Sequence, residues 1–374
     1  MKIGIDARLW TETGVGRYIR NLVKYLQIVD KKNDYVLFVR SDDVGDLNFE
    51  IRNSNFEFRL VDIRWHTMSE QLYFRKILEK ENLDLMHFPY FSLPYMYNRP
   101  YIVTIHDLII HHFPTGKAST LPLPIYHLKR LGYKIILNKA VEKAGRIIVP
   151  LQSTKDDVIA TLKVKSERII VTYEGVDEAV LNSETKKIQN KLKTLNNRYF
   201  LYVGNAYPHK NIETLIEAFL SLSSEMEDTQ LILVGKEDYF YKKIEDRIIK
   251  EKIINIKILH DVSDEDLTQM YSNAIAVVMP SFMEGFGLVP LEAMANNCPV
   301  IVSDIPAHNE VCRDAAWYFK PTSIKDLSDL LLRFITNKAY DIERKRIKGY
   351  QRVKDFSWLK MAKETVAIYE QYKR

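Results

Sequence analysis

The chain has 374 residues, of which 46% are hydrophobic and 28% charged, and its net charge is +5. These values are typical of a globular protein, they exclude an intrinsically disordered chain, and the length suits two domains of ordinary size. The mild positive charge fits anionic ligands or an anionic membrane surface, and it does not indicate a nucleic-acid partner.

The two cysteines, Cys298 and Cys312, form neither a metal-binding spacing nor a disulfide framework. They favour a reducing compartment. The first ten residues lack the pattern of a signal peptide, and no apolar run approaches the roughly 20 residues that span a bilayer. We therefore expect a cytoplasmic protein.

In the first half of the chain, short apolar runs alternate with longer amphipathic segments. Strands are predicted at 2–7, 35–39, 83–88, 101–105, 146–150 and 168–173, and helices at 18–27, 71–81, 153–162 and in a basic segment that ends near 144. This alternation predicts a parallel sheet with helices on both faces.

The polar stretch 182–197 interrupts the pattern and is the best candidate for a linker. The alternation then resumes, with strands predicted at 199–204, 230–235, 255–259, 275–280 and 298–303, and helices at 213–222, 238–251, 264–274 and after Pro290. The prediction is an α/β protein with two doubly wound, Rossmann-like domains, over 1–182 and 196–355, facing across a cleft. Ligands of such sheets lie outside the carboxyl ends of the strands.

The segment SFMEGFGLVPLEAMA (281–295) places two glutamates on either side of a glycine-rich turn. We expect Glu284 in the loop and Glu292 in the first turn of a helix that starts near Pro290. The backbone N–H groups of 285–288 would then form a phosphate cradle. A solvated loop acid and a simple stabiliser of the helix start are equally good explanations of the two glutamates from physics alone.

This segment resembles the hallmark of the retaining glycosyltransferases of family four, which have the two-domain GT-B fold. Their motif is a glutamate, seven residues and a second glutamate in a phrase similar to the one here. The resemblance implies that Glu284 contacts hydroxyls of the donor sugar and that Glu292 binds the ribose. It also implies that the amides of Gly285, Phe286, Gly287 and Leu288 hold the sugar and diphosphate.

Two further motifs of the family fall in the predicted first domain. TGVGRYIRNL (13–22) resembles its glycine loop, which implies that Gly14 and Gly16 approach the donor phosphate or the acceptor. VTIHDL (103–108) resembles its His-Asp pair, which implies that His106 lies near the donor sugar and phosphate, with Asp107 as its orienter. Without the resemblance, turn glycines and a structural histidine would be the more frequent explanations.

Other motifs fall in the predicted second domain. VGNAYPHKN (203–211) resembles the family's diphosphate-binding phrase, which implies donor contacts at Gly204, Asn205 and Lys210. Asn205 and His209 stand where many members have arginine, so the usual arginine–lysine pair is reduced to Lys210. A solvated lysine at a helix entry is the alternative.

The remaining motifs complete the resemblance over nearly the whole chain. LHDVSDEDL (259–267) resembles the segment that borders the nucleotide base, at Asp261 and Val262, and it also predicts a helix N-cap at Ser263 or Asp264. The tail 356–374 resembles the last helix of the family, which returns to the first domain.

The resemblance implies transfer of a mannose- or rhamnose-like hexose from a GDP-, UDP- or dTDP-sugar to a growing glycan or lipid-linked acceptor of a surface polysaccharide. His106, Lys210 and Glu284 are the expected catalytic residues, and neither a metal nor a cofactor is required. His106 and Asp107, with Gly16, are expected on the acceptor side. A sugar-nucleotide epimerase or hydrolase, or a silent sugar-nucleotide-binding protein, are the alternatives.

The basic, apolar segment 123–146 has two explanations. One is a domain helix with a solvated basic face. The other is peripheral binding to anionic lipid at the inner face of the cell membrane.

Overall fold

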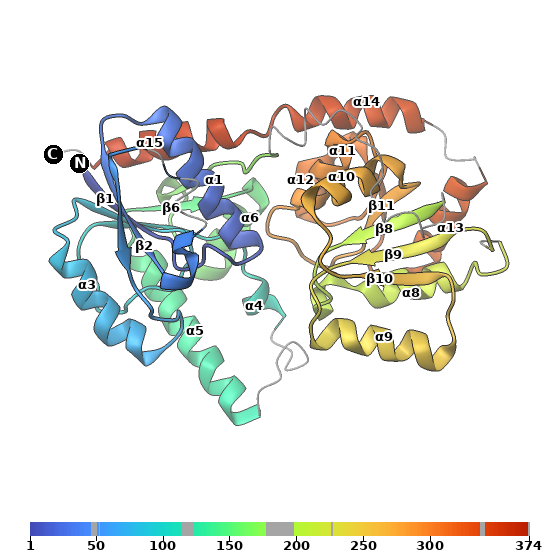
Figure 1. The fold of residues 1–374 in the computed structure, drawn as a ribbon, viewed down its shortest axis with the longest axis horizontal. Coiled ribbons are helices and arrows are strands. Elements are labelled where there is room, and N and C mark those ends of the chain that lie inside the picture. The colour runs from blue at the N-terminus through green and yellow to red at the C-terminus, as the bar shows by residue number, and fades with distance from the viewer. Residues whose placement is uncertain are drawn as a thin grey trace. The chain divides into compact units, whose positions relative to one another are not determined.

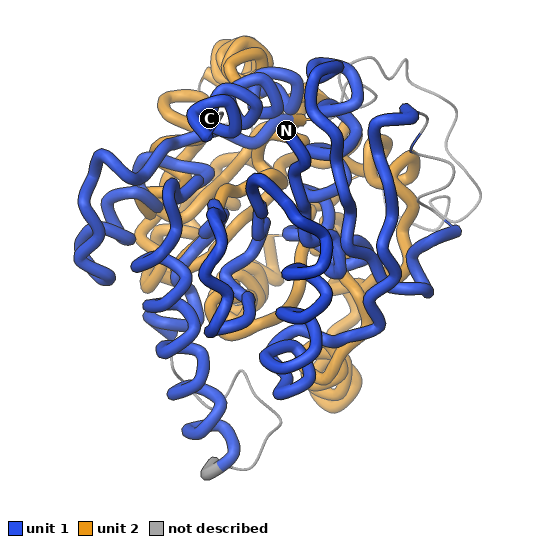
Figure 2. Tube along the Cα trace, turned by 90° about the vertical axis from the view of Figure 1, so that its left-hand side faces the viewer, with its two compact units in different colours: residues 1–175, 357–374 blue, residues 176–356 orange. Residues whose placement is uncertain are grey.

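The structure is a computed structural model, and it describes residues 1–45, 51, 53–113, 123–176, 198–225, 227–336 and 341–372. The chain divides into two compact units, unit 1 (Met1–Gly175 and Ser357–Arg374) and unit 2 (Val176–Phe356), coloured separately in Figure 2. The predicted linker 182–197, and with it the predicted domain boundaries at 182 and 196, lies outside the described residues.

Unit 1 is built on a seven-stranded parallel sheet with the order β3-β2-β1-β4-β5-β6-β7. Its strands are β1 (Lys2–Asp6), β2 (Asp34–Val39), β3 (Phe56–Leu60), β4 (Leu85–Phe88), β5 (Tyr101–Thr104), β6 (Arg146–Val149) and β7 (Ile169–Val171). Three of these strands, β1, β2 and β6, are labelled in Figure 1. The order reverses direction between β1 and β4, which is the point where ligands bind in doubly wound sheets. The predicted strands are all present, and β3 at the sheet edge is an addition.

The helices of unit 1 follow the predicted pattern with one local change. They are α1 (Gly14–Val29), α3 (Arg75–Lys80), α4 (Ile109–His112), α5 (Leu123–Lys143), α6 (Gln152–Leu162) and α15 (Trp358–Glu370), with short turns at Ser41–Asp43 (η1) and Ser166–Arg168 (η4). The helix predicted at 71–81 begins as a π-helical turn, η2 (Glu70–Phe74), before α3. Such turns are frequent at functional sites.

The C-terminal helix α15 belongs to unit 1, although the chain reaches it from unit 2 (Figure 2). Trp358 at its start is buried, and the Tyr369 hydroxyl lies 2.7 Å from Nδ1 of His87 on β4. A Cβ on Gly175 would lie 2.3 Å from the backbone nitrogen of Trp358, so only glycine allows the two segments to pass each other.

Unit 2 carries a six-stranded parallel sheet with the order β10-β9-β8-β11-β12-β13. Its strands are β8 (Tyr199–Val203), β9 (Gln230–Val234), β10 (Ile256–Leu259), β11 (Ala276–Met279), β12 (Val300–Ser303) and β13 (Trp317–Phe319). Its helices are α8 (Ile212–Leu220), α9 (Tyr239–Glu251), α10 (Asp264–Asn273), α11 (Leu288–Ala295), α12 (Pro306–Cys312), α13 (Ile324–Ile335) and α14 (Ile342–Val353), with short turns at Pro208–Lys210 (η6) and Arg313–Ala315 (η7).

The predicted fold class, α/β with two doubly wound parallel sheets, is confirmed. Strands β4, β9 and β11 are buried along their whole length, as expected for parallel sheets covered on both faces. In the part of the chain that the structure describes, no helix is both long enough and apolar enough to span a bilayer.

Candidate functional site

The carboxyl edge of the unit 2 sheet gathers most of the predicted donor-binding residues. Gly204 follows β8, Asp261 follows β10 and Glu284 follows β11, and all these strands are parallel. Parallel strands present their carboxyl ends at one edge of a sheet, so loops far apart in the sequence meet there.

The centre of this edge is an ion pair between Lys210 and Glu284. Nζ of Lys210 donates to both carboxylate oxygens of Glu284, at 2.8 and 2.7 Å, and the Ser281 hydroxyl donates to Oε1 at 2.6 Å. The side chains are 15% and 8% exposed. Two predicted site residues 74 positions apart in the chain are therefore in direct contact.

The charge state of Glu284 follows from these neighbours. Burial raises the pKa of Glu284, but the charge of Lys210, with smaller contributions from His308 and the hydrogen bonds, holds it below its usual range. Glu284 is therefore a carboxylate at neutral pH, and it is suited to accept hydrogen bonds rather than to act as a general acid.

Backbone contacts fix the two loops that carry the pair. Asn211, in the left-handed conformation with φ of 56°, ends the 208–210 turn, and its side-chain amide donates to the carbonyl of Pro280 at 2.9 Å. The N–H of Phe282 donates to the carbonyl of His209 at 2.8 Å. The loops after β8 and β11 are therefore hydrogen-bonded to each other at two points.

The turn after Glu284 differs from the prediction at the helix start. Gly287 has φ of 90°, a conformation that favours glycine, and α11 starts at Leu288, two residues before Pro290. Glu292 consequently lies beyond the first turn, so it does not stabilise the helix start as expected. The first N–H groups of α11, at Leu288 and Val289, have no partner within the helix and suit an anion.

Glu292 lies buried at the contact between α11 and α10. Its Oε2 accepts a hydrogen bond of 2.9 Å from the hydroxyl of Tyr271, which is also buried. The sequence analysis did not identify Tyr271. This contact fixes the orientation of the carboxylate.

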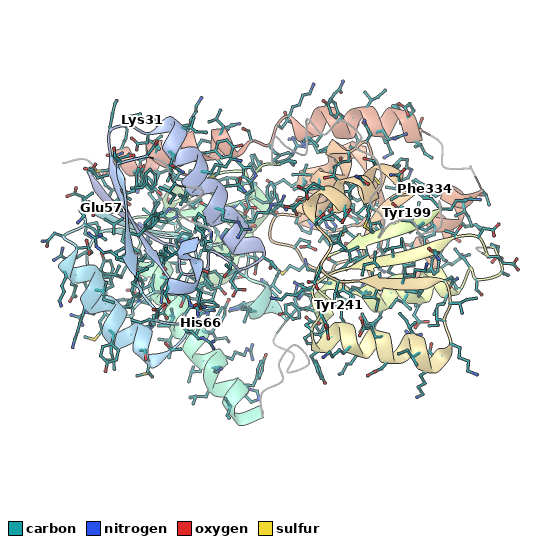
Figure 3. All side chains as sticks on the ribbon, viewed as in Figure 1. Lys31, Glu57, His66, Tyr199, Tyr241 and Phe334 are labelled. Atoms are coloured by element: carbon teal, nitrogen blue, oxygen red, sulfur yellow. The ribbon has the colours of Figure 1, made fainter. Side chains whose placement is uncertain are left out.

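Two tyrosines shape the loop at Gly204 and Asn205. The Tyr202 hydroxyl donates to the carbonyl of Asn205 at 2.6 Å, and the Tyr241 hydroxyl, labelled in Figure 3, donates to the carbonyl of Gly204 at 2.7 Å. The side chain of Asn205 accepts from the N–H of Tyr207 at 3.4 Å. Asn205 therefore supports the turn that leads to Lys210.

The loop between β10 and α10 carries Asp261 and Val262. Asp261 adopts the left-handed conformation with φ of 53°, and Ser263 caps α10 by accepting from the N–H of Asp266 at 3.1 Å. The predicted cap is confirmed at Ser263.

His308 on α12 is a residue of this edge that the sequence analysis missed. It is fully buried, its Nδ1 lies 2.9 Å from the carbonyl of Ser303, and its Nε2 has no hydrogen-bond partner among the described residues. A Cβ on Gly287 would lie 3.8 Å from its ring, so His308 lies beneath the glycine turn. The only sequence signal was its position shortly after a buried strand.

In unit 1, His106 is held by a carboxylate other than the predicted one. Its Nδ1 lies 3.2 Å from Oε1 of Glu174, and its Nε2 lies 2.9 Å from the carbonyl of Pro89. Asp107 instead caps the next turn, accepting from the N–H of Ile109 at 2.9 Å. The prediction that Asp107 orients His106 is wrong, because Glu174 and the carbonyl of Pro89 are the partners of the two ring nitrogens.

Both partners of His106 are hydrogen-bond acceptors, so the imidazolium satisfies both. Burial lowers the pKa of His106, but the hydrogen bond and the charge of Glu174 outweigh it and raise the pKa above its ordinary value. The stabilisation is therefore complete below about pH 6.5 and is lost as pH rises through the raised pKa.

We predict that Glu174→Gln lowers the melting temperature more at pH 6 than at pH 9. A hydrogen bond to a charged group contributes about 1.5–3 kcal/mol, and this contribution falls toward the roughly 0.5–1.5 kcal/mol of an ordinary hydrogen bond once the imidazole is neutral. Thermal unfolding at both pH values measures the difference, with Glu167→Gln at an exposed position as control. A difference that is independent of pH would contradict the assignment.

The two glycines predicted at the first loop have different roles. A Cβ on Gly16 would lie 2.5 Å from the carbonyl oxygen of Trp10, so Gly16 allows α1 to approach the preceding loop. Gly14 starts α1 and faces open space. The structure thus gives a packing reason for Gly16 and leaves Gly14 accessible.

Within the described residues, no group of three or more His, Cys, Asp or Glu side chains is arranged to hold a metal ion. The free thiols of Cys298 and Cys312 are buried, and burial raises the pKa of each to about 12.

The sequence of the chain is similar to known families and proteins. Residues 13–180 match the family model described as Glycosyltransferase Family 4, and residues 183–354 match Glycosyl transferases group 1. The chain is 30% identical over 307 residues to the O-antigen chain mannosyltransferase RfbU of Salmonella typhimurium, covering 78% of this chain and 80% of the relative. It is 27% identical over 384 residues to the O-antigen chain mannosyltransferase B of Escherichia coli, covering 96% of each.

Solved structures share the fold at lower identity. Sucrose-phosphate synthase from Thermosynechococcus elongatus superposes with a TM-score of 0.78 at 20% identity, covering 99% of this chain and 98% of that one. Anabaena HepE, solved with UDP and glucose, superposes with a TM-score of 0.75 at 16% identity, covering 99% and 100%. WaaG, a glycosyltransferase involved in lipopolysaccharide biosynthesis, gives a TM-score of 0.74 at 15% identity, covering 98% and 99%. The two matched family models, which between them span nearly the whole chain, and the 30% identity to RfbU show that this protein belongs to the glycosyltransferases of family 4.

Proposed function

We propose that this glycosyltransferase moves a mannose-like hexose from a nucleotide sugar to a growing glycan or lipid-linked acceptor in surface polysaccharide biosynthesis. The observation that carries the proposal is the Lys210–Glu284 pair beside the Gly287 turn, in a chain related to two O-antigen chain mannosyltransferases. We further propose that transfer retains the anomeric configuration and needs no metal ion.

The chemistry of the pair supports a diphosphate leaving group. Lys210 would exchange one carboxylate oxygen for the donor diphosphate, and the N–H groups at the start of α11 would share the charge that develops there. Glu284, kept ionised, would accept hydrogen bonds from sugar hydroxyls, and Glu292 would hold the ribose. His106, as an imidazolium, is the proposed catalytic residue of unit 1.

The donor is proposed from two sources. The relatives named as mannosyltransferases favour a mannose donor, and the HepE structures with UDP and UDP-glucose show that the same fold holds a uridine nucleotide. Asp261 and Val262 are the residues proposed to border the base. GDP-, UDP- and dTDP-linked sugars are therefore all to be tested.

The test is a transfer assay with radiolabelled GDP-mannose, dTDP-rhamnose and UDP-glucose against octyl glycosides of mannose, rhamnose, galactose and N-acetylglucosamine. We expect a hexosylated product from GDP-mannose, formed equally in EDTA, with the α configuration shown by NMR. An isomerised nucleotide sugar would identify an epimerase, and release of free sugar without transfer a hydrolase. Tight binding without turnover of any donor would identify a silent binding protein.

We also propose that α5 binds an anionic membrane surface at the inner face of the cell membrane. Its exposed apolar side chains Ile125, Leu128, Leu131 and Ile135 alternate with Lys129, Arg130 and Lys134. Apolar side chains beside basic ones suit the boundary between headgroups and acyl chains.

The prediction is that the protein sediments with vesicles that contain phosphatidylglycerol and much less with pure phosphatidylcholine. Leu128→Glu with Leu131→Glu should abolish sedimentation, whereas Ile249→Glu with Ile254→Glu, at exposed positions of unit 2, should leave it unchanged. Equal binding to both kinds of vesicle would remove the proposal.

A further inference from the structure

We infer that His66 binds a sugar of the acceptor at the carboxyl edge of the unit 1 sheet, and that a buried Arg8–Glu70 pair holds it in position. This inference rests on the proposed function for the identity of its ligand. His66 lies in the loop between β3 and η2, a segment in which the sequence analysis assigned no site residue.

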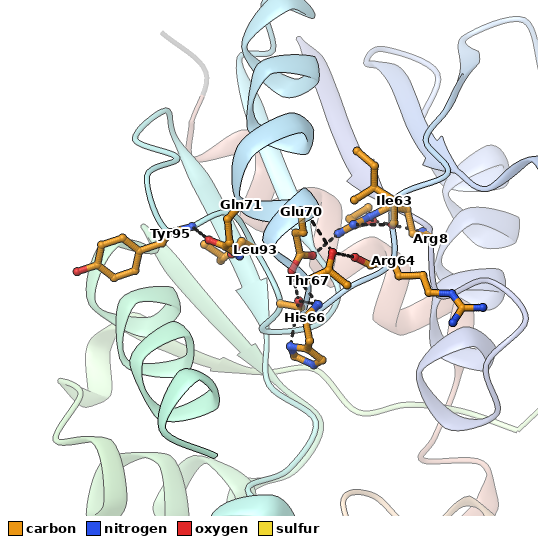
Figure 4. Close-up of polar contacts among 11 residues, drawn as sticks. Arg8, Ile63, Arg64, His66, Thr67, Glu70, Gln71, Leu93 and Tyr95 are labelled. Carbon is orange, nitrogen blue, oxygen red and sulfur yellow. Dashed lines mark hydrogen bonds and ion pairs between the residues drawn. The ribbon is translucent and has the colours of Figure 1, made fainter. Parts of the chain in front are cut away.

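The loop is anchored on a buried ionic cluster, shown in Figure 4. Arg8 follows β1, and its Nη2 donates to Oδ2 of Asp6 and to Oε1 of Glu70, each at 2.7 Å. The side chains of Arg8 and Glu70 are each 1% exposed. The guanidinium also lies 3.8 Å from the centre of the Phe74 ring, in the π-helical turn η2.

The same cluster holds the loop at both ends. Nη1 of Arg8 donates to the carbonyl of Ile63 at 3.1 Å, where the loop begins. Oε2 of Glu70 accepts from the N–H of His66 at 2.9 Å and from the Ser92 hydroxyl at 2.8 Å. A buried ion pair adds little stability compared with apolar packing, so we assign this pair the role of positioning the loop.

His66 itself has a strained backbone and remains exposed. Its φ is 58°, the left-handed region that few residues other than glycine adopt, and the Glu70 carboxylate holds it there. Strain of this kind costs on the order of 1–3 kcal/mol and concentrates at binding and catalytic sites. The exposed fraction of His66 is that of a surface residue, so its imidazole is accessible to a ligand.

The neighbours of His66 lie in a segment that also contacts His106. Its ring centroid lies 5.8 Å from that of Tyr90 and 5.3 Å from that of Phe91, and both residues follow β4. Pro89, in the same segment, contacts His106. Both histidines therefore contact residues 89–92, at the point where the strand order reverses between β1 and β4.

The chemistry of this site suits an uncharged sugar. An imidazole beside aromatic rings offers a hydrogen-bonding group for hydroxyls and apolar surface for the C–H face of a pyranose. All three nitrogens of the Arg8 guanidinium donate hydrogen bonds to carboxylate or carbonyl oxygens of the protein. The guanidinium is therefore not available to bind a phosphate. The ligand class that fits is the terminal hexose of the acceptor.

The first test is steady-state kinetics with the octyl glycoside that the transfer assay selects. His66→Ala should raise the acceptor KM at least tenfold and leave the donor KM and donor hydrolysis within twofold, and His66→Gln should recover part of the loss. Glu70→Gln should raise the acceptor KM in the same way. The control is His112→Ala, at an exposed histidine of unit 1 that pairs with Asp157.

If His66 had only a structural role, His66→Ala would lower kcat and the melting temperature, and it would not raise the acceptor KM more than the donor KM. An unchanged acceptor KM in His66→Ala, or an equal rise of both KM values, would overturn the inference. If the wild-type protein transfers no hexose, the proposed function fails.

A second measurement does not depend on turnover. Methyl α-D-mannoside should shift the imidazole Cε1–H signal of His66 in protein with ¹³C-labelled histidine, the signal being assigned by its loss in His66→Ala. If the wild-type protein transfers no hexose but the His66 signal shifts, the conclusion that His66 binds a sugar still stands. No shift at saturating concentrations would overturn it.

Discussion

Lys210→Ala is expected to lower kcat for sugar transfer roughly 100- to 1,000-fold, the effect of losing one group that stabilises charge in a transition state. In this chain Asn205 and His209 stand where many members of the family have arginine, and Asn205 supports a turn instead. Burial and the charge of Lys210 lower the pKa of His209 to about 4, so it is neutral at pH 7. Lys210 is therefore the cation of this loop that we propose for the diphosphate, and initial rates with saturating donor measure its contribution.

The same substitution should also destabilise the protein, because it leaves the Glu284 carboxylate buried without its partner. Breaking a buried pair in this way costs about 3–5 kcal/mol. Lys210→Met combined with Glu284→Gln removes both charges, so it should recover much of the melting temperature while activity stays low. Lys242→Ala, at an exposed pair with Glu237, is the control and should change neither quantity. Near-normal transfer by both Lys210→Ala and Glu284→Ala would contradict the site assignment.

The sequence was sufficient for features that depend on local pattern. Continuous apolar runs indicated the buried central strands of both sheets, and the glutamate motif with its family resemblance indicated the carboxyl edge of unit 2. The edge strands β3 and β13 were missed because they are short and partly exposed, so their patterns resemble loops. The start of α11 was misplaced because Gly287, with φ of 90°, ends the loop before Pro290 is reached.

Contacts between residues far apart in the chain could not be predicted from local sequence pattern. Glu174 lies 68 positions from His106, and Tyr271 lies 21 positions from Glu292, and no periodicity relates such pairs. These four residues share only their position in the fold. Glu174 and His106 each follow the carboxyl end of a strand, and Tyr271 and Glu292 each lie in a helix that follows a strand. The Arg8–Glu70 cluster gave even less signal, because a charged residue directly after β1 is usually solvated.

Arg8→Met should lower the free energy of unfolding of unit 1 by about 3–5 kcal/mol, because Asp6 and Glu70 are then left as buried carboxylates without a cation. For a unit of this size that corresponds to a fall in melting temperature of roughly 10 °C. Three of the four tryptophans, Trp10, Trp65 and Trp358, lie in unit 1. In a Trp317→Phe background, tryptophan fluorescence therefore follows the unfolding of unit 1 alone.

The comparison variants separate the buried charge from the lost side chain. Arg344→Met removes an arginine of unit 2 whose pair with Asp341 is exposed, and it should change stability by less than about 1 kcal/mol. Asp6→Asn and Glu70→Gln added to Arg8→Met remove the unpaired charges, so at least half of the lost stability should return. The Glu70→Gln change also weakens the bond to the N–H of His66, so the recovered protein should remain impaired in acceptor binding. Removing a buried arginine that binds two carboxylates should cost much more stability than removing an exposed arginine. If Arg8→Met and Arg344→Met lower the free energy of unfolding equally, the cluster does not hold this loop.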